Sequence, residues 1–193
     1  MKADDKKELR KRMLALRRAL TRQEVKARSD RVLSRLLAGG LLSGPKTAAL
    51  YAAADGEVLT RPLHDRLRER GALVVLPRVR GAGPEIDFYP AGDWDRLELS
   101  PLGIPEPRPD GEPVDPAAFD LVITPGVAFD RSGARLGYGM GCYDRTLQRT
   151  RPETPRVGIA YDFQVVERLP VEPHDVPLTH IVTESVIIHP STG

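Results

Sequence analysis

Short apolar runs alternate with stretches of helical periodicity along this chain, and no other feature constrains its fold as strongly. Runs with the length and composition of buried strands occur at residues 47–51, 72–76, 119–124, 156–161 and 181–188. Pro77 follows the second run and is expected to end it, because proline interrupts the hydrogen-bond ladder of a strand. Strands that alternate with helices form a mostly parallel sheet. The pattern therefore predicts an α/β fold with helices flanking both faces of the sheet.

The helices are indicated by apolar periodicity and by capping residues. Four apolar residues recur at helical spacing in the first helix, namely Leu9, Met13, Leu16 and Leu20. Thr21 and Glu24 then form a capping box that satisfies free backbone N–H groups of a second helix. That helix ends at Gly39, and its predicted inward residues are Val25, Val32, Leu33, Leu36 and Leu37. Further helices are predicted at residues 60–70 and 143–150, and residues 80–116 predict loops around one short strand.

Length and composition favour a single globular domain over residues 1–193. The chain is 40% hydrophobic and 29% charged, which is typical of a folded protein rather than a disordered one. No apolar run reaches the roughly 18 residues that a membrane helix needs, and the charged first residues do not resemble a signal sequence. Cys142 is the only cysteine, so no disulfide can form within the chain. We expect a cytoplasmic monomer that does not associate with a membrane.

Charge is distributed unevenly, although the net charge is only +2. Residues 1–35 contain thirteen Lys or Arg and five Asp or Glu. Such a segment could bind nucleic acid or a small anion, and it could equally be the solvated face of a helix.

The richest candidate site is a glycine-containing segment at residues 133–145. Gly137, Gly139 and Gly141 alternate there, and glycine lets backbone N–H groups converge on an anion. Arg135 can add a planar cation that suits phosphate, and Asp144 would repel a phosphate unless a cation such as Mg²⁺ lay between them. The alternative interpretation is a tight turn followed by an ordinary first-turn acid. The pattern matches neither the lysine-ending phosphate loop nor the dinucleotide-binding signature.

Residues 125–145 resemble the signature of the 5-formyltetrahydrofolate cyclo-ligase family, roughly PGxxFDxxGxRLGxGxGxYD. The resemblance extends beyond this segment, because the spacing of Lys6 and Arg10, residues 55–58 and residues 169–184 are similar to other parts of the family pattern. It thus spans nearly the whole chain. Met140 and Cys142 depart from the pattern, which usually has Lys or Gly at the first position and an aromatic residue at the second.

The resemblance implies an ATP- and Mg²⁺-dependent ligase of one-carbon metabolism that converts 5-formyltetrahydrofolate into 5,10-methenyltetrahydrofolate. By position, it implies that ATP is bound by Lys6, Arg10, Arg135, Leu136, Gly137, Tyr138, Gly139, Met140, Gly141, Cys142 and Tyr143. The residues implied in folate binding are Ala52, Glu57, Tyr138, Gly139, Met140, Gly141 and Cys142. Asp144 and Asp175 would hold Mg²⁺, and the residues implied in catalysis are Glu57 and Arg135.

This chemistry suits the residue types, because phosphoryl transfer depends on positioning and charge neutralisation rather than on a covalent nucleophile. Two alternatives are open. A nucleic-acid-binding module would use the basic helices without catalysis, although such a face tends to exclude acids such as Glu57, Asp144 and Asp175. A phosphotransferase acting on another small molecule would have a similar ATP site, and only substrate tests separate it. We expect a reduced folate and ATP as partners, and no nucleic acid.

Overall fold

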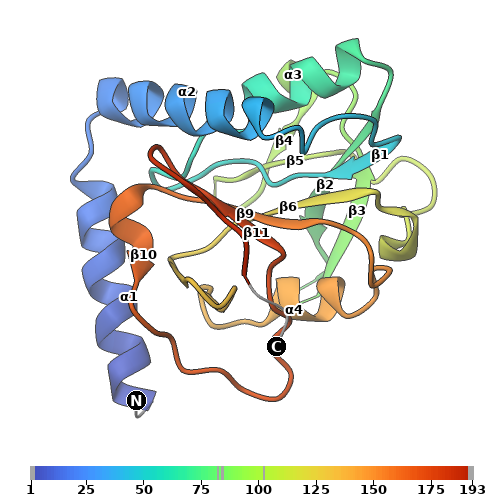
Figure 1. Ribbon diagram of the computed structural model, residues 1–193. Helices are drawn as coiled ribbons and strands as arrows, with labels where there is room; N and C mark the ends of the chain where they lie inside the picture. Colours follow the sequence, from blue (N-terminus) through green and yellow to red (C-terminus); the bar gives the residue numbers. More distant parts are fainter. Residues whose placement is uncertain (1–2, 82, 84, 102, 191–193) are drawn as a thin grey trace.

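Seven strands of the computed structural model form one sheet in the order β12-β11-β9-β6-β1-β2-β3 (Figure 1). The structure describes residues 3–81, 83, 85–101 and 103–190. Within these residues the inner strands run parallel, and β3 and β12 add antiparallel edges. From one edge to the other, the strands are β12 Ile187–Ile188, β11 His180–Val182, β9 Arg156–Ile159, β6 Leu121–Thr124, β1 Thr47–Ala49, β2 Leu73–Val79 and β3 Ile86–Pro90. The predicted mostly parallel α/β fold is confirmed.

Helices cover both faces of this sheet, with α2 and α3 on one face and the short α4 on the other (Figure 1). The helices are α1 Ala3–Arg18, α2 Arg22–Ala38, α3 Arg61–Glu69 and α4 Cys142–Leu147. The predicted capping box fixes the turn between α1 and α2, because Thr21 Oγ1 accepts from the Glu24 N–H at 3.2 Å and the Glu24 carboxylate accepts from the Thr21 N–H at 2.8 Å. Among the described helices, none combines the length and apolar character required to cross a membrane.

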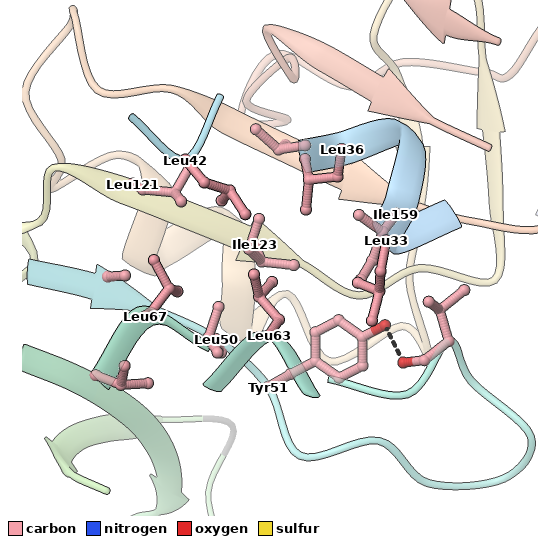
Figure 2. Close-up of a cluster of buried hydrophobic side chains, with 14 of the residues drawn as sticks. Leu33, Leu36, Leu42, Leu50, Tyr51, Leu63, Leu67, Leu121, Ile123 and Ile159 are labelled. Atoms are coloured by element: carbon pink, nitrogen blue, oxygen red, sulfur yellow. Dashed lines mark hydrogen bonds between the residues drawn. The ribbon is translucent and has the colours of Figure 1, made fainter. Parts of the chain in front are cut away.

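Each face of the sheet buries its own apolar cluster, because successive strand residues point to opposite faces. Ala48 belongs to the cluster under α2 and α3, whereas Ala49 belongs to the cluster on the face of α4, together with Phe119 and Leu147. Figure 2 shows how helix and strand side chains meet in the first cluster, where the labelled residues are Leu33, Leu36, Leu42, Leu50, Tyr51, Leu63, Leu67, Leu121, Ile123 and Ile159. The Tyr51 hydroxyl is satisfied there by the Val58 carbonyl oxygen at 2.9 Å.

Smaller elements join these layers. A three-stranded sheet in the order β10-β7-β8 packs against α1 through a third apolar cluster that contains Met13 and Leu136. Its strands are β7 Ala128–Asp130, β8 Arg135–Leu136 and β10 Val165–Val166. The region predicted to hold one short strand also forms a two-stranded hairpin, β4 Glu98–Leu99 with β5 Pro105–Glu106. Single 3₁₀ turns occur at η1 Trp94–Arg96, η2 Pro116–Ala118 and η3 Asp162–Gln164.

The sequence prediction was wrong about two of the strands. Residues 181–188 do not form one strand, because Thr183 Oγ1 accepts from the backbone N–H groups of Ser185 and Val186, both at 3.2 Å, and turns the chain back between β11 and β12. β2 does not end at Pro77. Since the ladder between β2 and β3 is antiparallel, only alternate residues donate to it, and Pro77 occupies a position that requires no N–H.

α1 buries only part of the apolar face that its sequence predicts, since Met13 is buried and Leu9 packs beside it but Leu16 is not covered. Leu16 is 47% exposed, whereas the neighbouring Arg17 is only 1% exposed. Arg17 lies four residues after the buried Met13, on the same face of the helix. A charged group can be buried in this way only if protein atoms replace the water that it loses, and the oxygen atoms around Arg17 belong to the candidate site.

Candidate active site

The glycine segment forms a loop between β8 and α4, and two arginines lie against it. Gly139 and Gly141 have φ angles of 101° and 66°, which residues with side chains rarely adopt. A Cβ atom at Gly137 would lie 3.2 Å from Arg135 Nη1, and one at Gly139 would lie 3.5 Å from Arg10 Nη2. The glycines therefore let two guanidinium groups approach the loop backbone, which concentrates positive charge where an anion could bind.

α1 supplies the first of these arginines. Arg10 Nε donates to the carbonyl oxygen of Gly137 at 2.9 Å. Lys6, one turn earlier on the same face, pairs with Glu172 at 2.6 Å, and their side chains are 22% and 53% exposed. Lys6 and Arg10 thus share a helix face, as their spacing predicts, and they bring α1 against both the glycine loop and the segment that precedes Asp175.

Asp144 is paired with the second arginine. Arg135 Nη2 lies 2.8 Å from Asp144 Oδ1, and their side chains are 5% and 19% exposed. Gln148 donates to the carbonyl oxygen of His174 at 2.9 Å, so the segment that carries Asp175 lies beside the end of α4. In the part of the chain that the structure describes, no three His, Cys, Asp or Glu side chains are grouped to hold a metal ion. Mg²⁺ at this place would fit two carboxylates only if phosphate oxygens or water completed its ligands.

The second half of the site is a tight turn that buries Glu57. The Glu57 N–H donates to the Ala54 carbonyl oxygen at 2.9 Å, and Glu57 Oε2 accepts from the Ala54 N–H at 3.1 Å. Between them, Asp55 and Gly56 have φ angles of 49° and 74°, as in a type I′ turn. Glu57 is 8% exposed, and burial raises its pKa to about 7, although the charge of Arg17 opposes the shift. A carboxyl group with this pKa can exchange a proton near neutral pH.

Arg17 connects this turn to the glycine loop. Its Nε donates to the Asp55 carbonyl oxygen at 2.8 Å, and its Nη1 lies 3.6 Å from Glu57 Oε1. Its Nη2 donates to the hydroxyl of Tyr138, whose ring centre lies 5.7 Å from the guanidinium carbon. The sequence interpretation missed Arg17, and the only available signal was its place two helical turns after Arg10.

A cleft of about 510 Å³ opens beside the turn, between the end of α1 and the start of α2. The residues around it include Arg17, Arg22, Val25, Ala53, Ala54 and Glu57. Ala52, which the resemblance implies in folate binding, is buried, and its neighbours line the cleft. The cleft therefore combines apolar side chains, such as Val25, with the charged groups of Arg17 and Arg22 and the buried carboxyl group of Glu57.

The other predicted residues of the glycine loop differ in exposure. Met140 is 54% exposed, whereas Leu136 is 6% exposed and packs in the cluster of Met13, so Leu136 can offer a ligand only its backbone. The Tyr143 hydroxyl is buried without a hydrogen-bond partner in the described residues. Cys142 is half-buried, and burial raises the pKa of its thiol. Cys142 is consequently a neutral thiol at physiological pH rather than a reactive thiolate.

Arginines held against a glycine loop, beside a buried acid, are the groups that an α/β enzyme acting on an anionic substrate would need. The model of the 5-formyltetrahydrofolate cyclo-ligase family matches residues 2–184, and the chain belongs to this family. Over 177 residues, the chain is 38% identical to the 5-formyltetrahydrofolate cyclo-ligase of Escherichia coli K12, and the alignment covers 89% of this chain and 96% of that one. Over 189 residues, it is 33% identical to the enzyme of the same name from Mycolicibacterium smegmatis, with 95% of each chain covered.

Solved structures agree with this assignment. The 5,10-methenyltetrahydrofolate synthetase of Aquifex aeolicus is similar with a TM-score of 0.83 and 39% identity, covering 97% of this chain and 94% of that one. The 5,10-methenyltetrahydrofolate synthetase of Mycoplasma pneumoniae is similar with a TM-score of 0.77 and 29% identity, covering 94% of this chain and 99% of that one. The family resemblance of the sequence is thereby confirmed.

Proposed function

We propose that this enzyme converts 5-formyltetrahydrofolate into 5,10-methenyltetrahydrofolate, using ATP and Mg²⁺ and releasing ADP and phosphate. The continuity of the two halves of the site carries the proposal. Arg10 is hydrogen-bonded to Gly137 and Arg17 to Tyr138, the next residue along the chain, so one helix connects the loop to both halves of the site. A phosphate bound on the Arg10 side would be close to a formyl group bound on the Arg17 side.

Positive charge supports ATP binding in the half that contains Lys6, Arg10 and Arg135. Among the described residues, Arg135 Nε is buried and has no hydrogen-bond partner, and an unpaired buried donor gains from an incoming phosphate oxygen. The backbone of the loop from Arg135 to Tyr143 would surround the same phosphates. ATP binding would also compete for the cations that now pair with Glu172 and Asp144.

Asp144 and Asp175 are the carboxylates proposed to hold Mg²⁺. When bound, the ion neutralises the charge between carboxylate and phosphate oxygens. If Asp144 turned from Arg135 to the metal, the guanidinium of Arg135 would be released toward the phosphate. Asp144, through the metal ion, and Arg135 would then both neutralise charge on the transferred phosphoryl group, from opposite sides.

The cleft beside Glu57 supports binding of the formylated folate. The formyl oxygen of an amide is a poor leaving group, and transfer of the terminal phosphoryl group to it breaks the P–O bond to ADP and forms a P–O bond to the formyl oxygen. The neighbouring folate nitrogen then attacks the formyl carbon, and the C–O bond breaks as phosphate leaves. Glu57, with its pKa of about 7, would accept the proton that this nitrogen loses. Arg135 would stabilise the charge on the transferred group.

A turnover assay with single omissions tests the proposal. The protein is mixed with 5-formyltetrahydrofolate, ATP and Mg²⁺, and the absorbance of the methenyl product is followed while each component is left out in turn. Product should form only in the complete mixture, with one ADP for each methenyl group. ATP consumption with another acceptor, and none with the folate, would favour the phosphotransferase alternative. Tight RNA binding without turnover would favour a nucleic-acid-binding module.

A further inference from the structure

Arg17 makes more contacts across the site than its neighbours on α1 do. Its side chain is 1% exposed, and its guanidinium lies between the turn of Asp55, the carboxyl of Glu57 and the hydroxyl of Tyr138. Its Nη1 also donates to the carbonyl oxygen of Gly126 at 3.4 Å. One buried side chain therefore joins α1 to three segments that are far apart in the sequence.

Arg18 provides a natural contrast. It also pairs with Asp55, through Nε and Oδ1 at 2.7 Å, but its side chain is 62% exposed. Exposed ion pairs of this kind contribute little to stability, because water and salt screen them. The two arginines therefore differ in what they reach beyond Asp55. Among the described hydrogen bonds and ion pairs, Arg17 reaches Glu57, Tyr138 and the Gly126 carbonyl oxygen, and Arg18 reaches none of these.

The turn that carries Glu57 is built to fit Arg17. A Cβ atom at Gly56 would lie 2.9 Å from the backbone oxygen of Arg17, closer than two such atoms can approach. Asp55, whose φ of 49° lies in the left-handed region, offers its carbonyl oxygen to Arg17 Nε from within this turn. The backbone around Glu57 and the guanidinium of Arg17 are thus positioned by the same close contact.

Several titratable groups face Glu57, and only one of them is a buried cation. Arg17 comes from α1, Asp55 from the same turn, Tyr138 from the glycine loop, Tyr51 from the segment after β1 and Tyr143 from α4. Asp55 opposes ionisation of Glu57, whereas Arg17 and the hydroxyl of Tyr138 favour it. Among these groups, Arg17 is the largest influence that keeps the carboxyl able to ionise.

We infer that Arg17 is a positioning residue that fixes the Glu57 carboxyl and the Tyr138 hydroxyl relative to each other, beside the cleft that Arg17 and Glu57 line. The role in catalysis that this inference gives to Arg17 rests on the proposed function. Arg17 acts through Glu57 and Tyr138 rather than on the phosphates, which lie with Arg10 and Arg135 in the other half of the site. A planar guanidinium with several donors can hold these partners together, and the single ammonium of lysine cannot replace it.

Titration of Glu57 by carboxyl-carbon NMR tests the inference directly, on the full chain labelled at glutamate. Glu57→Gln assigns the signal. Arg17→Met should raise the midpoint of Glu57 by about one pH unit or more, because an opposite charge at this range lowers a carboxyl pKa by about one to three units. Tyr138→Phe should raise it by less. Arg18→Met is the matched control, since it removes a cation from Asp55 and should leave the Glu57 midpoint in place.

Kinetics of the same variants separate positioning from charge alone. Arg17→Lys keeps the charge, so the midpoint of Glu57 should move little, yet kcat should fall at least about tenfold while the KM for ATP stays unchanged. The pH profile of kcat should contain an apparent pKa that is missing in Glu57→Gln, and this apparent pKa should be higher in Arg17→Met and in Tyr138→Phe. If Arg17→Met does not fold, the Lys and Phe variants still decide the matter.

Three results would overturn the inference: an unmoved Glu57 midpoint in Arg17→Met, an equal shift in Arg18→Met, or full kcat in Arg17→Lys. Absence of folate turnover in the unaltered protein would instead reject the proposed function. The NMR titration would still decide whether Arg17 positions Glu57, because it needs no substrate.

Discussion

The two ends of α1 place cations in opposite surroundings. Near the start of the helix, Lys6 forms an ion pair with Glu172 in which both side chains keep access to water. Near its end, Arg17 is 1% exposed and faces Glu57, whose carboxyl pKa is raised by burial to about 7. Exposed pairs rearrange at little cost, whereas buried ones are fixed by every group around them. The comparison shows that one helix can carry an exposed cation, Lys6, that is able to change partners when an anion binds, and a buried cation, Arg17, whose position is fixed beside a carboxyl group.

The largest expected effect tests the rigid end. Glu57→Gln keeps the shape of the side chain but cannot accept a proton, so kcat should fall by about 100- to 10,000-fold. The Kd for ATP should change little, because Glu57 lies in the other half of the site. Steady-state kinetics and ATP titration measure the two effects separately. A parallel loss of ATP affinity would show that the two ends of α1 do not act on different ligands.

The pH dependence of stability sharpens the same contrast. Because the pKa of Glu57 is raised from 4.5 to about 7, the folded state favours the protonated carboxyl. Protonation of Glu57 contributes about 3 kcal/mol to the free energy of unfolding. This contribution is fully present below about pH 4.5 and is lost as the pH rises through about 7. Urea unfolding at about pH 5 and pH 8 should show this loss in the unaltered protein and not in Glu57→Gln. Equal slopes for both proteins would mean that Glu57 is not buried as described.

The metal site should respond more moderately. Loss of even an outer partner of a metal ligand lowers affinity about 10- to 100-fold, so Asp144→Asn should need at least about tenfold more Mg²⁺ for half-maximal activity. Asp175→Asn should need more Mg²⁺ as well, and the double variant should be little worse than either, because both acids would serve one ion. Mg²⁺ titration of the three variants measures this. If Asp175→Asn behaved like the unaltered protein, Asp144 would be the sole protein carboxylate on the metal.

The smallest effects should occur at the exposed end. Arg10→Ala should raise the KM for ATP about tenfold or more, because Arg10 is bonded to the glycine loop and a charged hydrogen bond contributes about 1.5–3 kcal/mol. Lys6→Ala should raise it by less than about fivefold, since exposed pairs contribute up to about 1 kcal/mol. High salt should reduce the Lys6 effect more than the Arg10 effect. An unchanged KM for ATP in both variants would remove α1 from the phosphate site.

Most of the fold was accessible from the sequence, because it depends on local patterns. The apolar runs predicted the inner strands, and the capping box of Thr21 and Glu24 predicted the break between the first two helices. The close approach of Arg10 to the glycine loop was also foreseeable, since the spacing of Lys6 and Arg10 and the glycine motif occur in one family pattern. In each case the residues that carry the signal are near one another in the chain or belong to a recognisable motif.

The remaining features depend on contacts that only the folded chain creates. A helical pattern of leucines favours burial of Leu16, but Arg17 is buried in its place because Asp55, Glu57 and Tyr138 supply its partners. The turn after β11 likewise depends on the hydrogen bonds that Thr183 accepts from Ser185 and Val186, two and three residues later. The periodicity of a sequence does not indicate contacts with distant segments. A buried arginine therefore cannot be distinguished from a solvated one in this way.

The contacts of α1 also bear on when the site forms during synthesis. This helix leaves the ribosome before the loop that it contacts, because Arg10 hydrogen-bonds to a residue 127 positions later and Arg17 to one 121 positions later. Until those residues emerge, the helix lacks the partners that bury its charge, and a short isolated helix is only marginally stable in water. The contacts of Arg10 and Arg17 with the glycine loop are accordingly absent until residue 138 has emerged. A nascent chain released before residue 138 would carry the basic helix without the loop that it holds, and we expect such a fragment to be a substrate for chaperones and proteases.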